Sequence, residues 1–405
     1  MKMAAEVNSN PGSNDVLRIG VITAIPTPYR DPFWNVFAGD SRTHLHVYYC
    51  AATSADRPWD AMWQMRYDHD FLPGHNLLKA FPSKGSCYWN PGIGRQLKAG
   101  RHDALIVGGY NYPTMMYAML YAHRRNIPYF LMSESHLREP RAVWRRVGKE
   151  PIIRAIVRNA AGCLPTGTWA REYLLHYGAR PDRLTFFPNV PDVEALDRKA
   201  QELATRRGEV RRDLGLGDWP VVLYVGRLVE FKRVDLLIEA FAKVASRLSA
   251  RLVIVGDGLQ RPRLKALAKQ LGIADRILFK GFVEPAEVSL WYAAADLMVL
   301  PSVGETWSVA VLESLASGLP VVTTDTVGAA ADAIIDPAVG SIVRTGDVDA
   351  LADAIAARLE TGTDRNLVRA RWGTMRERFR YEAVAHNLLA AVRLAVDEQR
   401  AGHEI

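Results

Sequence analysis

The fold is decided by the stretch Val221-Val222-Leu223-Tyr224-Val225-Gly226-Arg227-Leu228-Val229-Glu230-Phe231-Lys232, in which an apolar run ends at a glycine and leads into a helical pattern. From there to Thr324, short apolar runs alternate with longer segments of helical periodicity. Such alternation is typical of parallel strands that helices bury on both faces. The strands predicted after 221–225 are 252–255, 276–279, 297–300 and 321–324, and the predicted helices are 233–247, 260–271, 285–294, 307–317 and 329–334.

Outside this region the alternation continues, less regularly toward the N-terminus. Residues 53–92 are rich in aromatic residues, proline and glycine, and are predicted to form an irregular excursion with one or two short helices. The charged stretch from Pro191 to Asp218 is predicted to connect two α/β domains, whose ligands belong at the carboxyl ends of the strands. The other predicted strands are 17–23, 44–50, 104–107, 128–132, 162–165 and 184–187, and the other predicted helices are 113–125, 142–159, 168–177, 347–359 and 366–396.

Composition excludes several classes of protein. Apolar residues make up 49% and charged residues 23% of the 405 residues, which excludes fibrous and largely disordered chains. No apolar run reaches the roughly 18–20 residues that cross a bilayer, and the polar N-terminus predicts no secretory signal. Three distant cysteines predict reduced thiols, with neither a disulfide framework nor a zinc site. A cytoplasmic protein is expected.

Charge is distributed unevenly along the chain. The net charge is +7, with +9 on the first 190 residues and −2 on the rest. A basic half suits an anionic partner, which is a nucleic acid, an acidic membrane or a phosphate-bearing substrate. Basic residues are dense over 138–158, so this segment is either an amphipathic surface for an anionic leaflet or a solvated helix face. The N-terminal aromatic residues show no RNA-binding pattern, so no nucleic acid is expected.

Two glycine-containing loops follow predicted strands. Gly226 is followed by Arg227 and, five residues further on, by Lys232, while the chain contains neither a dinucleotide fingerprint nor a Walker motif. The two cations either hold a diphosphate without a metal or are solvated charges at a helix cap. The second loop, Gly256-Asp257-Gly258, permits a tight turn that is either structural or ligand-facing.

A pair of glutamates marks the segment 301–320. Glu305 and Glu313 are eight residues apart, which predicts that they share one face of a helix that is otherwise apolar. A carboxylate on a buried helix needs a partner or a ligand. The alternatives are an internal ion pair and, for Glu305, a helix cap.

In order and spacing, these segments, with Gly281-Phe282-Val283 and Gly318-Leu319-Pro320, resemble the retaining glycosyltransferases of family 4, which use nucleotide sugars. The resemblance is strong over about 220–350 and weaker over 1–190. It implies the GT-B fold, an α/β architecture in which two Rossmann-like domains with parallel sheets face each other across a cleft. The implied parts are an acceptor domain over 1–192, a linker over 193–218, a donor domain over 219–379 and a C-terminal helix, about 380–405, that packs back on the first domain.

The resemblance also implies roles for single residues. Arg227 and Lys232 match the groups that bind the donor diphosphate and stabilise it as a leaving group. Glu305 matches the residue that addresses the transferred sugar, and Glu313 matches the carboxylate that accepts hydrogen bonds from the ribose. The backbone at Phe282 and Val283 matches the nucleobase slot. The implied donor site further includes Gly226, Gly256, Thr306, Trp307 and Ser308.

This chain departs from the family pattern at two places. Relatives usually read Glu-Gly-Phe-Gly where it has Glu305-Thr306-Trp307-Ser308, which leaves the identity of the sugar open. Arg233 stands where glycine is common.

Acceptor-side candidates come from loops of the first half. A histidine in the loop after strand 128–132 often contacts the sugar in relatives, so His136 is a catalytic candidate with Glu134 as its competitor. The alternative is that His136 begins a helix and faces solvent. The remaining acceptor-side candidates are Tyr29 and Arg30, in a loop that resembles the one of bacterial polysaccharide enzymes, and Gly109 and Tyr110 after strand 104–107.

The predicted function is transfer of a hexose from a nucleotide diphosphate sugar, UDP- or GDP-linked, to a hydroxyl of a lipid-linked or polysaccharide-precursor acceptor, with retention. Neither a metal nor another cofactor is expected, and the membrane contact would be peripheral, at the anionic inner membrane. The alternatives are an epimerase-like enzyme of the same fold, a phosphorylase, although no lysine for pyridoxal phosphate is evident, and a non-catalytic nucleotide-sugar-binding subunit.

Overall fold

A computed structural model describes residues 16–54, 64–79, 86–138 and 143–402, with the side chains of 143–148 left aside. The chain divides into two compact units. The first comprises Met1–Pro26, Trp34–Phe130 and Val392–Ile405, and the second comprises Thr27–Phe33 and Leu131–Ala391. No helix within the described ranges is long and apolar enough to cross a membrane.

The first six-stranded sheet has the order β3-β2-β1-β6-β7-β8, and β1, β2, β3 and β6 pair in parallel. Its apolar central strands, such as β1 and β6, are buried, as the short apolar runs predict. The strands are β1 (Leu17–Thr23), β2 (Thr43–Tyr49), β3 (Asp68–Phe71), β6 (Ala104–Val107), β7 (Tyr129–Ser133) and β8 (Gly162–Pro165), with a separate antiparallel pair β4 (His75–Asn76) and β5 (Tyr88–Trp89). The helices of this part are α1 (Asp31–Ala38), α2 (Ile93–Gly100), α3 (Pro113–Arg124), α4 (Val143–Arg158) and α5 (Thr168–His176).

The second sheet, also of six parallel strands, has the order β11-β10-β9-β12-β13-β14. The strand order reverses between β9 and β12, and ligands of such sheets bind outside the carboxyl ends at this switch point. The strands are β9 (Val221–Val225), β10 (Arg251–Val255), β11 (Ile277–Gly281), β12 (Leu297–Leu300), β13 (Val321–Thr324) and β14 (Gly340–Val343). Two parallel sheets confirm the predicted α/β class.

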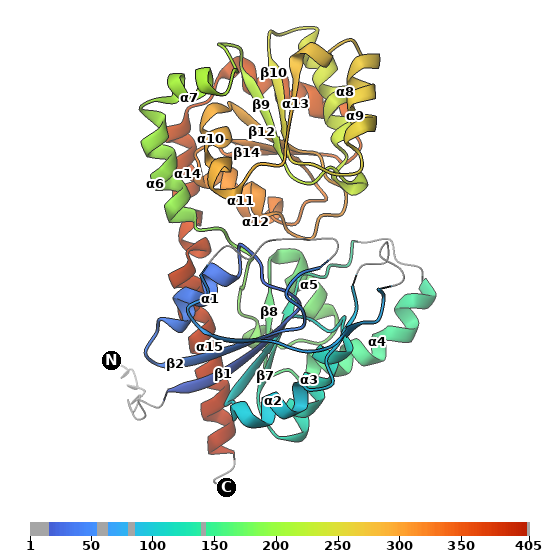
Figure 1. Cartoon of the computed structure of the whole chain (residues 1–405), viewed down its shortest axis with the longest axis vertical. Helices are drawn as coiled ribbons and strands as arrows, with labels where there is room; N and C mark the ends of the chain where they lie inside the picture. The colour runs from blue at the N-terminus through green and yellow to red at the C-terminus, as the bar shows by residue number, and fades with distance from the viewer. Residues whose placement is uncertain (1–15, 55–63, 80–85, 139–142, 403–405) are drawn as a thin grey trace, which may run out of the picture. The chain divides into compact units, whose positions relative to one another are not determined.

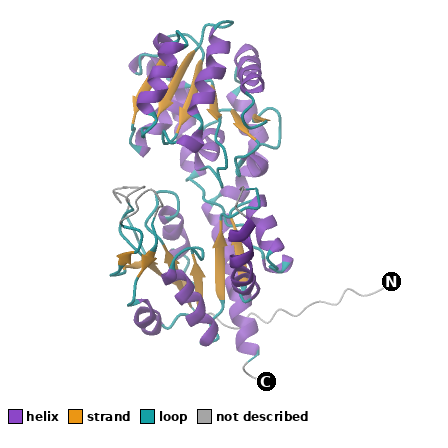
Figure 2. Ribbon diagram, turned by 90° about the vertical axis from the view of Figure 1, so that its right-hand side faces the viewer, coloured by secondary structure: helices purple, strands orange, loops and turns teal. Residues whose placement is uncertain are grey.

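Helices lie on both sides of the second sheet (Figures 1 and 2). α8 packs against α9 and α13, while α10 and α11 pack against α6. The helices are α6 (Val193–Ala204), α7 (Arg207–Asp213), α8 (Val234–Ala245), α9 (Arg261–Gln270), α10 (Pro285–Ala294), α11 (Val309–Ala316), α12 (Ala330–Ala333), α13 (Val348–Thr361), α14 (Arg365–Arg376) and α15 (Tyr381–Ala401). The predicted linker thus contains two helices, α6 and α7, and the domain boundaries stay a prediction.

Three expected elements differ from the structure. The strand expected over 184–187 is a single bridge between Leu184 and Cys163. Thr185 and Phe187 still donate to Cys163 O and Pro165 O, and the pairing ends at Pro188, which has no N–H to continue it. The helix expected over 366–396 is interrupted by the 3-10 turn Glu377–Phe379 and an extended Arg380. The described part of 53–92 holds the short strands β3, β4 and β5 and no helix, while 55–63 and 80–85 lie outside the described residues.

The helix that carries Glu313 begins later than expected. α11 begins at Val309, because Ser308 has φ 114° and ψ 102°, which no right-handed helix tolerates. Glu305 therefore lies in the loop, where it forms a bridge with Val327. The prediction that Glu305 and Glu313 share one helix face is wrong.

Candidate functional site

The loops after β9, β10 and β11 lie against one another through glycines. The N–H of Gly226 donates to Val255 O at 3.0 Å, and the N–H of Gly256 donates to Gly281 O at 2.8 Å. A Cβ on Gly256, which has φ 130°, would lie 1.9 Å from the carbonyl oxygen of Gly226. Only glycine permits this approach, so the second glycine loop holds the first in place.

Arg227 follows Gly226 at the carboxyl edge of the sheet, and its side chain is exposed. Its backbone is held by a residue of β9, because the hydroxyl of the buried Tyr224 donates to Arg227 O at 3.0 Å. Burial and the nearby Glu305 raise the pKa of Tyr224 well above its usual value, so this hydroxyl keeps its proton. The loop therefore presents a cation to solvent on a rigid backbone.

Lys232 and Glu305 meet at the switch point. Lys232 ends the 3-10 turn after β9, Glu305 follows β12, and the Lys232 Nζ donates to Glu305 Oε1 at 2.5 Å. Both side chains are largely buried. Glu305 Oε2 is also buried and makes no hydrogen bond to any described residue. The internal ion pair left open by the sequence is thus present, together with an acceptor oxygen available to a ligand.

Glu313 is held by a buried tyrosine. The hydroxyl of Tyr292 in α10 donates to Glu313 Oε2 at 2.8 Å. Desolvation raises the pKa of Glu313, and the hydrogen bond from Tyr292 opposes this change. Since one oxygen is engaged by Tyr292, the other remains for a hydroxyl of a ligand.

Replacing Glu313 by glutamine should change how stability depends on pH. The folded state raises the pKa of Glu313 above 4.5, so the proton is bound more tightly in the folded chain. Wild-type stability then carries a contribution that is complete below about pH 4.5 and is lost as pH rises through the folded pKa. Urea unfolding midpoints across pH should show Glu313→Gln gaining stability relative to wild type as pH rises, whereas parallel curves would contradict the assignment.

The other expected donor residues lie at the same edge of the second sheet. Phe282 is 68% exposed directly after β11, while Val283 is buried. Trp307 is buried and donates from Nε1 to Asn189 O at 2.8 Å. Ser308 is buried with positive φ, a conformation that suits the glycine of relatives.

A polar chain connects Arg30 to Thr306. The buried guanidinium of Arg30 lies 4.1 Å above the Phe187 ring and donates to Pro188 O and to Asn189 Oδ1. The Asn189 amide donates to Glu134 Oε1 at 2.5 Å, and the Thr306 hydroxyl donates to Glu134 Oε2 at 3.4 Å.

Desolvation of the buried guanidinium lowers the pKa of Arg30 to about 10, and the nearby Glu134 opposes this change. Arg30 therefore remains charged at neutral pH. The acceptor-side candidate Glu134 is joined directly to Thr306, a residue of the expected donor site.

The remaining acceptor-side candidates lie elsewhere. His136 is buried, accepts from the Arg138 N–H at Nδ1 and contacts the Trp169 ring at 5.5 Å, so the expectation that it could face solvent is wrong. Tyr29 is half-buried before α1 in the second unit. Gly109 (φ 122°) and Tyr110 follow β6 in the first unit, whereas the donor loops belong to the second.

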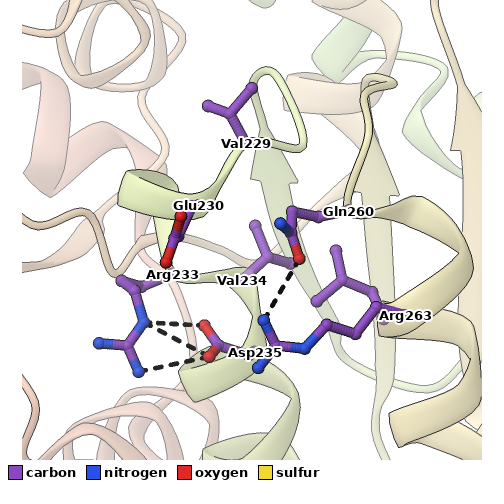
Figure 3. Close-up of a pocket in the computed structure, with 8 residues that line it drawn as sticks. Val229, Glu230, Arg233, Val234, Asp235, Gln260 and Arg263 are labelled. Atoms are coloured by element: carbon purple, nitrogen blue, oxygen red, sulfur yellow. Dashed lines mark hydrogen bonds and ion pairs between the residues drawn. The ribbon is translucent and has the colours of Figure 1, made fainter. Parts of the chain in front are cut away.

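A pocket of about 190 Å³ lies beside the loop after β9 (Figure 3). Arg233 lines it in a left-handed conformation (φ 47°), which explains why glycine is common there in relatives. Its guanidinium pairs with Asp235 at 3.0 Å, and Arg263 donates to Gln260 at 3.4 Å (Figure 3). Arg233 and Asp235 thus compensate each other's charge, whereas Arg263 keeps its charge beside the neutral Gln260.

Sequence reasoning missed Asn189, Tyr292 and Asp332. Asp332 accepts the N–H and the hydroxyl of Thr168 at the start of α5, each at 2.8 Å. Asn189 follows the segment 184–187 after one proline, Pro188, so a search of every loop after an apolar run would have found it. Tyr292 lies within an apolar helix and gives no such signal.

The basic segment 138–158 is partly described. Arg154 pairs with Glu150 at 2.6 Å, and Arg138 pairs with Glu172 at 3.4 Å while covering the Trp169 ring. Arg141 and the side chains of Arg145 and Arg146 lie outside the part of the chain that the structure describes. Within the described ranges, no three His, Cys, Asp or Glu side chains gather closely enough to hold a metal ion.

Two family profiles match the chain, "Glycosyl transferases group 1" over residues 206–384 and "Glycosyl transferase 4-like domain" over residues 40–190. The D-inositol 3-phosphate glycosyltransferase of Acidothermus cellulolyticus is 36% identical over 266 residues, which cover 62% of this chain and 58% of that protein. The chain thus spans little more than half the length of this relative.

Solved structures of the same architecture cover nearly the whole chain. A glycosyltransferase from Rickettsia africae superposes with a TM-score of 0.73 at 14% identity, covering 93% of this chain and 98% of that one. Anabaena Alr3699/HepE in complex with UDP and glucose gives a TM-score of 0.69 at 16% identity, covering 93% and 99%. At these identities the likeness shows the fold alone, and it confirms the GT-B architecture expected from the sequence.

Proposed function

The chain belongs to the group 1 glycosyltransferases, and from this premise we propose that it transfers a hexose from a nucleotide diphosphate sugar to an acceptor hydroxyl, with retention and without a metal. The observation that carries the proposal is the Lys232–Glu305 pair at the switch point of the second sheet. It joins a cation suited to phosphate with a buried carboxylate oxygen that no described residue engages.

In this proposal each group has a task. The ammonium of Lys232 has three N–H donors, of which one goes to Glu305, so two remain for diphosphate oxygens. Arg227 supplies a second cation, and the remaining oxygen of Glu305 accepts a sugar hydroxyl. Glu313 accepts a ribose hydroxyl, and the backbone at Phe282 and Val283 borders the nucleobase.

Charge development explains how these groups lower the barrier. Cleavage of the sugar–phosphate bond builds negative charge on the leaving diphosphate and positive charge at the anomeric carbon. Fixed cations stabilise the diphosphate, each by about 2–4 kcal/mol when well placed. The Glu305 carboxylate favours positive charge on the sugar. Stabilisation of the diphosphate is the task that a metal ion performs in other transferases.

We propose an acceptor that carries phosphate, either a lipid-linked or polysaccharide precursor or a smaller phosphorylated alcohol. The charge of +9 on the first 190 residues supports an anionic acceptor. The name of the Acidothermus relative, which specifies D-inositol 3-phosphate, is compatible with this class. Peripheral contact with an anionic membrane belongs to the same proposal.

Incubation with UDP-, GDP-, ADP- and TDP-sugars tests the proposal. We expect one donor class to raise the melting temperature and to release its nucleoside diphosphate, at the same rate with and without EDTA. Loss of activity that Mn²⁺ or Mg²⁺ restores would contradict the metal-free mechanism. An isomerised nucleotide sugar without release would identify an epimerase. Binding without turnover, even after phosphorylated alcohols and lipid-linked glycans are added as acceptors, would identify a non-catalytic subunit.

A further inference from the structure

Helix α3 of the first unit has two apolar faces. Its inner face, which includes Met115, Ala118, Met119 and Ala122, is buried in the core. Its outer face leaves Met116 41%, Tyr117 39% and Leu120 44% exposed. Met116 and Leu120 are four residues apart and therefore lie on one side of the helix.

Helix α2 extends this outer face. The two helices pack against each other (Figure 1). A Cβ on Gly94 of α2 would lie 2.6 Å from the Tyr117 hydroxyl, so this ring lies across α2. Tyr117 also contacts the Trp89 ring at 6.1 Å. The exposed apolar side chains of α3 and the outer side of α2 thus form one surface, here named the α2–α3 surface.

The α2–α3 surface is rimmed by cations. The exposed basic residues are Arg95 and Lys98 on α2, Arg101 after it, and His123, Arg124 and Arg125 at the end of α3. Among the described residues, no carboxylate lies within ion-pair distance of these arginines or of Lys98. Asp103 is the single acidic residue between positions 71 and 133, and it is already bonded to the Arg18 N–H and to Arg400.

We propose that the α2–α3 surface docks on the headgroup region of an anionic lipid bilayer. Apolar side chains that enter the interface, surrounded by Lys and Arg, are the chemistry that binds such a surface. A second copy of this chain would bring like charges together, which opposes association. A nucleic acid would satisfy the cations but not Met116 and Leu120.

This proposal assigns the membrane contact to α2–α3 rather than to the basic segment 138–158. In the described part of that segment, Arg138 and Arg154 already pair with glutamates. The inference rests on the proposed function in one respect, namely that the membrane would hold the acceptor. Vesicle binding is measured without turnover, so it can be tested even if the chain is inactive.

Co-sedimentation of the full chain with vesicles tests the proposal. One vesicle is phosphatidylcholine alone, and the other contains phosphatidylglycerol as well. We expect binding to the anionic vesicle that fades with salt, and a loss of about tenfold or more in Arg124→Gln/Arg125→Gln. Leu120→Gln should weaken binding to both vesicles, and its melting temperature shows whether the chain still folds.

Matched controls come from the second unit. Lys265 and Lys269 are exposed and four residues apart on α9, and Leu367 is 43% exposed on α14. Glutamine at these positions should leave vesicle binding unchanged. Donor turnover in the absence of vesicles should be the same in all folded variants. If the proposed function is wrong but the docking proposal is right, the wild type will be inactive and will still bind vesicles.

Several results would overturn the proposal. The first is a wild-type chain that does not co-sediment with anionic vesicles. The second is vesicle binding by the α2–α3 variants that equals that of the wild type. The third is loss of binding in Lys149→Gln/Arg154→Gln but not in the α3 variants. Wild-type dimers that Leu120→Gln dissociates would show that the surface joins two copies. Loss of vesicle-free turnover with intact vesicle binding would place these residues in the acceptor site.

Discussion

Replacing Arg227 or Lys232 by alanine should lower the turnover of a nucleotide sugar about a hundredfold or more in each variant. Both cations lie beside the loop after β9, where the close contact of Gly226 and Gly256 fixes the backbone. The loss arises from the charge that develops on the leaving diphosphate, so kcat should fall more than the affinity for donor. Steady-state kinetics of nucleoside diphosphate release measures both quantities.

The two variants should differ in stability. Arg227 is exposed, so its replacement should leave the melting temperature unchanged. Lys232 is paired with the largely buried Glu305, and removal of one partner of a buried pair costs about 3–5 kcal/mol. Lys243→Ala, which breaks an exposed pair with Asp349, is a matched control and should retain activity. Wild-type turnover in both Arg227→Ala and Lys232→Ala would exclude the assignment of the diphosphate to this loop.

Gly256→Ala should impair both folding and donor binding. The new Cβ would lie 1.9 Å from Gly226 O, and φ 130° is unfavourable for alanine, so the loops after β9 and β10 must separate. We expect a loss of about 2 kcal/mol or more in the free energy of unfolding, together with loss of donor affinity. Urea unfolding and a donor titration measure the two effects.

Gly272→Ala provides the control for this steric argument. Gly272 also has positive φ (70°), but a Cβ there meets nothing within 4 Å. Gly272→Ala should lower the free energy of unfolding by the backbone strain alone, about 1–2 kcal/mol, and should leave donor affinity unchanged. Equal behaviour of Gly256→Ala and Gly272→Ala would show that the contact between the two loops is unimportant.

The sequence predicted the elements of the second sheet well, because apolar runs such as 297–300 and 321–324 are fully buried parallel strands. It missed β3, whose sequence Asp-His-Asp-Phe has no apolar alternation. This edge strand pairs with β2 partly through His46 and Asp70, whose side chains lie 2.9 Å apart. It also missed β14, which is short and half-exposed. Strands stabilised by pairing alone leave little trace in hydrophobic periodicity.

The candidate site could be predicted in composition but not in detail. Gly226 and Lys232 were found because a glycine and a cation after a buried strand have a direct chemical meaning. The sequence predicts that Glu305 shares a helix face with Glu313, because the helical periodicity of the apolar residues continues through Ser308. Serine at this position gives no indication of a positive φ. The contacts of Asn189 with Glu134 and Trp307 join residues 55 and 118 positions apart, which no local pattern encodes.

The central claim, sugar transfer from a nucleotide diphosphate donor with retention, is tested most directly by NMR spectroscopy of the sugar that is released. The chain is incubated in EDTA with the nucleotide sugar that stabilises it most, without acceptor, and the anomeric proton of the product is followed before mutarotation. The account predicts a nucleoside diphosphate together with a sugar of the donor's own anomeric configuration, both greatly reduced in Arg227→Ala. The opposite anomer would contradict it. So would the absence of nucleoside diphosphate from every donor, even when phosphorylated alcohols and lipid-linked glycans are added as acceptors.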